Sequence, residues 1–363
     1  PLNSSGDAQG CRIEDGRVIT PDGFKDAWDK TWESGWRTIS APSRWGGQDA
    51  PTMLGSFVEE MFCGANTAFT MYTGLTQSAA ELILEFGTEE QKKKYVPKMM
   101  SGEWSGTMCL TEPHAGSDVG SASSGATRND DGTYNVQGNK IFISGGDSDL
   151  AENVIHLVLA RIEGAEAGTK GLSLFIVPRV RIDEDGSLGA LNDVTVPSIE
   201  HKMGINGSAT CVMNFGDDGN CLGEVVGGVE HQGIRQMFHM MNAARIGVGI
   251  QGLAVAAASY LSALEYARER KQGSSIKKFK DANAPRVPIL EHPNIRRDLL
   301  AMKARVEGVR ALVMKLSNHT DRLKATQGKD DESEAYHKGQ IDLLTPLVKA
   351  YGTDAAFEVS SRA

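Results

Sequence analysis

The hydrophobic pattern of this chain changes twice, and these two changes constrain its fold more than any other feature of the sequence. Between about residues 107 and 226, short β-rich apolar segments are separated by Gly and Asp turns, whereas helical spacing dominates before and after them. We therefore expect an α+β fold with an N-terminal helical domain (1–106), a middle antiparallel β-barrel domain (107–226) and a C-terminal helical bundle (227–363). The length of 363 residues is sufficient for a large core.

The N-terminal block carries helix signals after an irregular lead-in. Apolar residues recur at helical spacing from Phe24 to Trp36. Thr88-Glu89-Glu90-Gln91 is a capping box that begins a further helix, and Gly102 stands where that helix would end.

The middle block reads as a series of short strands. Asp130-Asp131-Gly132-Thr133 predicts a hairpin turn between residues 126–128 and 134–137. Further apolar strands are expected at 154–160, 172–177 and 211–215. Because no helical pattern separates them, they favour a small antiparallel barrel.

The C-terminal block is expected to contain three helices. The first two span 235–270 and 294–317, with a basic loop between them. A polar connector (320–334) precedes the third, which begins near Tyr336 and which Pro346 should kink. Since the end of the chain would cut this helix off, we expect an incomplete bundle and a fragment trimmed at both ends.

One motif in this block needs a second reading. Gly247-Val248-Gly249-Ile250-Gln251-Gly252 fits the dinucleotide fingerprint G-x-G-x-x-G. That fingerprint requires a strand before it and a helix that begins at it, whereas residues 237–245 already read as helix. We therefore expect these glycines to allow close helix–helix packing.

Bulk properties exclude several classes of function. The net charge of −9 argues against a nucleic-acid partner, because phosphate binding requires a positive surface. The five widely spaced cysteines form no CxxC pair, which predicts free thiols in a reducing compartment. No histidine spacing matches a metal motif, so we assign no metal. The most apolar stretch, Ile246 to Leu261, is interrupted by Gln251 and Ser259 and predicts a buried helix rather than a membrane span.

The stretch from Met108 to Gly120 carries the first chemical signal. An apolar strand leads into a Thr-Glu-Pro turn and a loop rich in Gly, Ser and Asp. Thr111 offers a hydroxyl and an N–H group to a heteroaromatic ring, and Gly116 and Ser117 offer donors to a phosphate. The alternative is a plain connection between a helical and a β domain.

A second motif, Gly138 to Gly145, lies about thirty residues further on. In an alternating strand Phe142 and Ser144 lie on one face, so that one stacks on a ligand while the other bonds it. The alternative places Phe142 in the barrel core.

Together these motifs resemble the acyl-CoA dehydrogenase family over essentially the whole chain. The segments at 202–210, 240–245 and 266–270 strengthen the resemblance. The basic loop and the His292-Pro293-Asn294-Ile295-Arg296-Arg297 run are similar to the larger bacterial members, such as the 3-methylmercaptopropionyl-CoA dehydrogenases. The resemblance implies an FAD-dependent enzyme of the bacterial cytoplasm that oxidises an acyl-CoA and passes electrons to an electron-transfer flavoprotein.

The resemblance also implies roles for individual residues. Met108, Leu110 and Thr111 would line the flavin, and Ser117 would contact the flavin pyrophosphate or the CoA arm. Phe142 and Ser144 would pack on and bond the flavin from its other side. Asn242 and Arg245 would lie beside the acyl-CoA. Arg270 would reach the flavin of a neighbouring subunit in a homodimer or homotetramer, although the aromatic residue that usually follows it is missing.

The catalytic base does not match the family pattern within this chain. The family's glutamate stands in a Tyr-Glu-Gly-Thr segment that is absent here, so we expect the base beyond Ala363. A minority of relatives place it where this chain has Ala244, and Glu358 lies on what would be a packing helix. This chain alone should therefore turn over little. Alternative functions are an acyl-CoA oxidase and a non-catalytic flavin- or CoA-binding scaffold.

Overall fold

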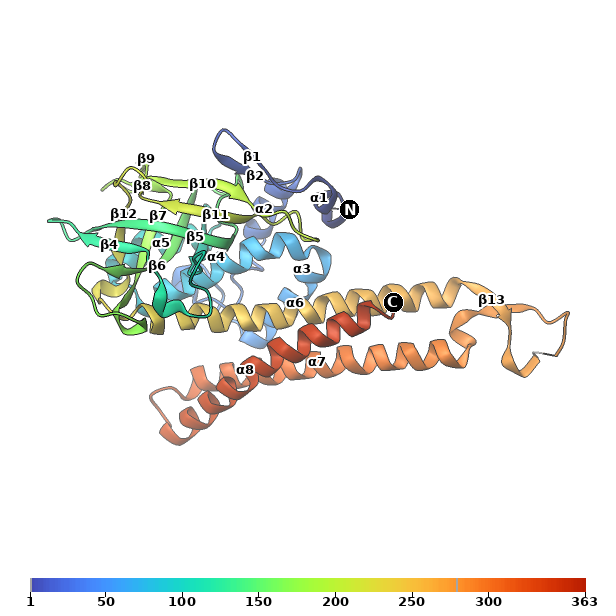
Figure 1. Ribbon diagram of the computed structural model, residues 1–363. Helices are drawn as coiled ribbons and strands as arrows, with labels where there is room; N and C mark the ends of the chain where they lie inside the picture. The colour runs from blue at the N-terminus through green and yellow to red at the C-terminus, as the bar shows by residue number, and fades with distance from the viewer. Residues whose placement is uncertain (1, 279) are drawn as a thin grey trace. The chain divides into compact units, whose positions relative to one another are not determined.

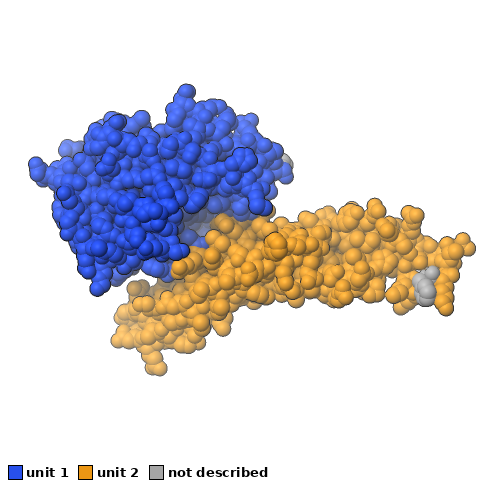
Figure 2. All heavy atoms as spheres, viewed as in Figure 1, with its two compact units in different colours: residues 1–50, 66–244 blue, residues 51–65, 245–363 orange. Residues whose placement is uncertain are grey.

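The computed structural model describes residues 2–278 and 280–363 and divides into two compact units. The first unit contains residues 1–50 and 66–244, and the second contains 51–65 and 245–363 (Figure 2). Each unit has its own core and is described by itself.

The first unit begins with helices and a hairpin (Figure 1). The expected irregular lead-in is wrong: α1 (Leu2–Gln9) precedes a hairpin of β1 (Arg12–Glu14) and β2 (Arg17–Ile19). The helices α2 (Phe24–Glu33), α4 (Thr67–Phe86) and α5 (Glu89–Met100) follow in this unit, with the short η1 (Ser43–Trp45) after α2. The predicted capping box is confirmed, because Thr88 Oγ1 accepts from the Gln91 amide and the Gln91 side chain accepts from the Thr88 amide.

Five strands close into a barrel. In order around the ring they are β5 (Tyr134–Ser144), β12 (Leu222–Val225), β7 (Leu172–Pro178), β6 (Asn153–Ile162) and β4 (Gly125–Arg128), which pairs again with β5. The predicted hairpin is confirmed, since Arg128 pairs with Tyr134.

The prediction of an antiparallel barrel is wrong, because the barrel contains parallel as well as antiparallel strand pairs. β3 (Trp104–Cys109) and β4 both run parallel to β6. A parallel pair requires a long crossover, which the residues between β3 and β6 supply by way of β4 and β5. The strands β11 (Thr210–Phe215) and β10 (Val194–Ile199) extend the sheet beyond β5, and β8 (Val180–Ile182) and β9 (Leu188–Leu191) form a separate hairpin.

Two buried clusters hold this unit together. One includes Phe175 of β7 and Phe215 of β11 and joins the barrel to the neighbouring strand. The other lies between the sheet and the helices and includes Tyr95 and Trp104. Because β3 and β6 contribute to both clusters, the residues just after β3 follow a rigid strand.

The second unit consists mainly of helices. These are α3 (Thr52–Ala65), the part of α6 (Gly233–Glu269) that follows residue 244, α7 (Pro293–Thr326) and α8 (Asp331–Ser360). A small hairpin of β13 (Lys271–Ser274) and β14 (Arg286–Pro288) follows α6. The predicted connector at 320–334 is wrong: α7 continues to Thr326 and only 327–330 are non-helical. Asp321, which lies in this stretch, accepts from the amides of Thr52 and Met53 at the start of α3.

The glycines of the G-x-G-x-x-G motif lie inside α6, as expected. A Cβ atom on Gly249 would lie 2.4 Å from Val348 Cγ1, and one on Gly252 would lie 2.6 Å from the Gly352 carbonyl oxygen. Both contacts are with α8, so the motif serves helix packing. In the described residues α6 is also the one helix long and apolar enough to cross a membrane, a test that core helices pass as well.

Candidate flavin site

The residues after β3 lie beside β5. The Ile141 amide donates to the Thr111 carbonyl over 2.9 Å, which connects the two motifs that the sequence singled out. Met108 and Leu110 are half-buried and pack against the cluster between sheet and helices. They therefore offer a supported apolar surface beside Thr111.

Phe142 lies on a β-bulge. The register between β5 and β11 shifts between the pairs Ile143–Cys211 and Lys140–Met213, so the strict alternation expected for this strand is broken. Lys140 and Ile143 are both buried, although they are three residues apart. Phe142 has φ 59° and a 59 % exposed side chain.

This conformation is costly for an aromatic residue. The left-handed region costs an L-residue roughly 1–2 kcal/mol, and an exposed Phe buries little surface in return. The alternative of a core residue is therefore wrong for Phe142. Strained residues with exposed apolar side chains are typical of ligand sites.

The hydroxyl groups near this bulge fit a polar, aromatic ligand. Throughout residues 2–278 and 280–363, no hydrogen-bond partner is found for the hydroxyls of Thr111, Ser117 or Ser144. Thr111 and Ser144 are half-buried and Ser117 is exposed. Thr111, which is bonded to the neighbour of Phe142, and Ser144, two residues after Phe142, place hydroxyl donors near an exposed aromatic ring, as a flavin ring requires.

A buried ion pair that the sequence did not single out lies directly behind this surface. Lys140 Nζ lies 2.8 Å from Glu112 Oε1, and both side chains are buried. Nζ also donates to the carbonyls of Leu110 (3.2 Å) and Leu159 (2.7 Å), which uses all three ammonium protons. Lys140 is missed because a lysine in a strand ordinarily faces solvent.

Each member of the pair stabilises the charged form of the other. Burial raises the pKa of Glu112, but the Lys140 ammonium and the hydrogen bonds from Ser123 and Ser124 outweigh it and bring the pKa to about 2. Burial lowers the pKa of Lys140, and the Glu112 carboxylate opposes that shift.

Glu112 also closes the loop that carries Ser117. Its Oε2 accepts from the Ser123 amide (2.7 Å) and hydroxyl (2.9 Å), and its Oε1 accepts from the Ser124 amide (3.1 Å). The loop from 113 to 122 thus begins and ends at one carboxylate.

The remaining predicted residues lie along and after α6. Asn242, in the first unit, and Arg245, in the second, are both half-buried and stand three apart on one helical face. Arg270 follows the helix, is exposed, and donates to Gln272 Oε1 over 3.4 Å. Their predicted roles concern ligands and partner subunits and stay predictions.

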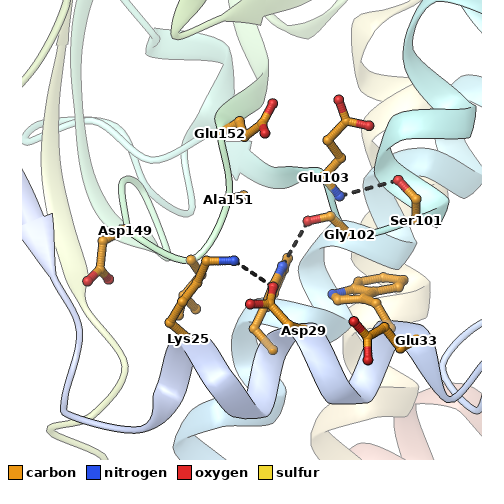
Figure 3. A pocket seen from close by; sticks show the side chains of 12 residues that line it. Lys25, Asp29, Glu33, Ser101, Gly102, Glu103, Asp149, Ala151 and Glu152 are labelled. Carbon is orange, nitrogen blue, oxygen red and sulfur yellow. Dashed lines mark hydrogen bonds and ion pairs between the residues drawn. The ribbon is translucent and has the colours of Figure 1, made fainter.

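A separate cleft of about 500 Å³ in the first unit contains none of the predicted site residues. It is lined by α2, by the turn before β3 and by residues 149–152 (Figure 3). Lys25 bonds Asp29 across one side, and Glu103 and Glu152 extend from the other. This acidic cleft would repel the phosphates of a flavin or of CoA.

Three family models cover most of the chain. The N-terminal domain model of the acyl-CoA dehydrogenases matches residues 13–103, the middle domain model 107–217 and the C-terminal domain model 231–363. The chain belongs to the acyl-CoA dehydrogenase family. The resemblance read from the motifs is thereby confirmed, as is the order of a helical, a β and a helical domain. The domain limits at 106 and 226 stay a prediction.

Curated relatives agree with this assignment. The chain is 41 % identical to a 3-methylmercaptopropionyl-CoA dehydrogenase of Ruegeria pomeroyi over 99 % of its own length and 60 % of the relative's. It is 42 % identical to a broad-specificity linear acyl-CoA dehydrogenase of Mycobacterium tuberculosis over 94 % of its own length and 56 % of the relative's. The chain therefore spans about 60 % of the length of these acyl-CoA dehydrogenases.

Solved structures show the same fold. Butyryl-CoA dehydrogenase of Megasphaera elsdenii aligns with a TM-score of 0.69 at 24 % identity, covering 99 % of this chain and 92 % of that one. An acyl-CoA dehydrogenase of Bacillus anthracis, solved with FAD, aligns with a TM-score of 0.73 at 24 % identity, covering 93 % and 55 %. Acyl-CoA dehydrogenases are FAD-dependent flavoproteins, and FAD is the cofactor of the family to which this chain belongs.

Proposed function

We propose that this protein is an FAD-dependent acyl-CoA dehydrogenase that converts an acyl-CoA thioester to the 2-enoyl-CoA. The observation that carries the proposal is Phe142, exposed at φ 59° on the bulge next to the Thr111 loop, in a chain whose three parts match this family. Electrons would pass to an electron-transfer flavoprotein.

Different residues of the site would bind different parts of the cofactor. Met108 and Leu110 would supply the apolar surface for the flavin ring, and Phe142 would pack on the ring. The hydroxyls of Thr111 and Ser144 would bond its polar edge. Ser117 lies on an exposed loop, where it would contact the pyrophosphate or the CoA arm.

Asn242 and Arg245 stand three residues apart in α6 and would contact the acyl-CoA. Arg270 would contact the flavin phosphates of a neighbouring subunit, so the proposal includes a homodimer or homotetramer. Its location would be the bacterial cytoplasm.

The reaction requires a base as well as the cofactor. Bound FAD supplies the acceptor for the β-hydrogen. Removal of the α-proton needs a carboxylate whose pKa is raised by burial. Glu358 does not meet this requirement, because its side chain is 50 % exposed and pairs with Arg305. We therefore do not assign Glu358 as the catalytic base.

Anaerobic titration of the FAD-loaded protein, in a form as long as its relatives so that the base expected beyond Ala363 is included, tests the proposal. Butyryl-CoA, isobutyryl-CoA and 3-methylmercaptopropionyl-CoA are added separately, and the long-wavelength absorption band of the flavin is followed. We expect at least one of them to bleach the band and to yield its 2-enoyl product by mass spectrometry. FAD binding without bleaching by any of the three would favour a non-catalytic scaffold.

The electron acceptor needs a separate measurement. A dehydrogenase reduces an added electron-transfer flavoprotein and consumes little oxygen under air. Rapid oxygen consumption with peroxide formation would instead identify an acyl-CoA oxidase.

A further inference from the structure

The buried ion pair of Lys140 and Glu112 occupies a position that stability alone does not explain. Both side chains are at most 1 % exposed, and three hydrogen bonds leave Nζ without a free proton. Removing two charges from water is costly, and apolar residues of similar volume often replace such pairs without loss of stability. A pair kept in a core therefore points to a geometric role.

The contacts of Lys140 lie on both sides of Thr111. Nζ bonds the carbonyl of Leu110 before it and the carboxylate of Glu112 after it. The next residue along β5, Ile141, bonds the Thr111 carbonyl itself. Three consecutive residues of the loop are thus fixed to two consecutive residues of a barrel strand.

The same pair adjoins the segments that carry the other predicted flavin contacts. Phe142 follows Lys140 by two residues and lies on the bulge between the buried residues Lys140 and Ile143. Glu112 bonds Ser123 and Ser124 and so closes the loop that carries Ser117. One ammonium group therefore connects the segments on which Thr111, Ser117 and Phe142 stand.

We propose that Lys140 and Glu112 form a positioning pair, which sets the Thr111 loop, the Ser117 loop and the Phe142 bulge at the relative positions that FAD requires. The part of this inference that concerns FAD rests on the proposed function. The part that concerns the order of the loops does not.

Three variants separate positioning from folding. Lys140→Met leaves the Glu112 carboxylate buried without its cation. Lys140→Met combined with Glu112→Gln removes both charges and keeps one side-chain oxygen, which can still accept from the Ser123 amide. The control is Lys94→Met combined with Glu224→Gln, which removes a 2.6 Å ion pair elsewhere in the same unit.

Urea unfolding and hydrogen exchange of the apo protein are the first measurements. We expect Lys140→Met to unfold at markedly lower urea concentration than the wild type, and the double variant to recover most of the lost stability. In the double variant the amides of 110–118 should still exchange at least tenfold faster than in the wild type, with the amides of β6 unchanged. The control pair should leave exchange in 110–118 unchanged.

FAD affinity, measured by quenching of flavin fluorescence, is the second. We expect the double variant to bind FAD at least tenfold more weakly than the wild type, and the control to bind it equally well. The proposal would be overturned if the double variant had both wild-type stability and wild-type exchange rates in 110–118, because the ion pair would then be replaceable. A wild-type protein that fails to bind FAD would refute the proposed function, while the exchange rates would still decide whether the pair orders the loops.

Discussion

The Nδ1 atoms of His319 on α7 and His337 on α8 lie 2.9 Å apart. Their ring centroids are 5.2 Å apart, so the two rings meet nearly end to end at these atoms. An N–H···N hydrogen bond fits this geometry, and it requires one Nδ1 to carry a proton and the other to carry none. The helical hairpin of the second unit thus contains a contact that two protonated imidazoles cannot keep.

This contact predicts a dependence of stability on pH. Burial, and then the positive charges of His337, Lys315 and Arg322, lower the pKa of His319 below its usual 6.5. From α3, Thr52, Met53 and Ser56 bond this part of α7. The unfolded chain therefore binds the proton more tightly, and stability is complete above about pH 6.5 and falls as the pH decreases through the folded pKa.

Urea unfolding between pH 8 and pH 5 measures the effect. We expect His337→Asn to lose roughly 1 kcal/mol at pH 8, as for one neutral hydrogen bond, and to show a weaker dependence on pH than the wild type. The control His201→Gln replaces an exposed histidine and should keep the wild-type dependence. Equal slopes in His337→Asn and the wild type would contradict the prediction.

Glycine substitutions in α6 should have opposite effects at neighbouring positions. Gly252→Ala places a Cβ 2.6 Å from the Gly352 carbonyl oxygen, and we expect a loss of roughly 1–3 kcal/mol in unfolding free energy. Gly247→Ala is the matched control: a Cβ there has no neighbour within 4 Å among the described residues, so helix propensity should stabilise it by up to about 1 kcal/mol. Thermal unfolding of the two variants compares them directly, and equal effects would show that α8 does not pack on Gly252.

Phe142→Gly should separate stability from cofactor binding. Glycine relieves the left-handed strain at φ 59°, so the unfolding free energy of the apo protein should stay the same or rise by up to about 1 kcal/mol. Loss of the ring should weaken FAD binding by about tenfold, as expected for one aromatic contact. Unchanged FAD affinity would remove Phe142 from the site.

The cysteines should resist alkylation in the folded protein. Burial raises the pKa of the thiols of Cys109, Cys211 and Cys221 to about 12 each, so little thiolate exists at pH 8. We expect Cys11, the partly exposed thiol, to react first with iodoacetamide, and all five to react in urea. Mass spectrometry of the intact protein counts the additions, and rapid reaction of all five without urea would contradict the burial.

Local patterns predicted much of this protein because they depend on neighbouring residues. The capping box at Thr88, the hairpin before Tyr134 and the glycines packed inside α6 follow from hydrogen bonds and spacing within a few residues. Each of the two motifs that were predicted to bind flavin is an unbroken run of sequence. Their residue types were therefore enough to indicate the family that the domain models confirm.

What the tertiary structure decided involves residues distant in sequence. The parallel pairing of β3 with β6, the bulge that exposes Phe142 and the pair of His319 with His337 depend on which segments meet, and a period of two or of 3.6 does not encode that. Lys140 shows the reason most clearly. A lysine in a strand reads as a solvent-facing residue, and only a fold that brings Glu112 and two carbonyls to within 3.2 Å of its ammonium makes it a buried one.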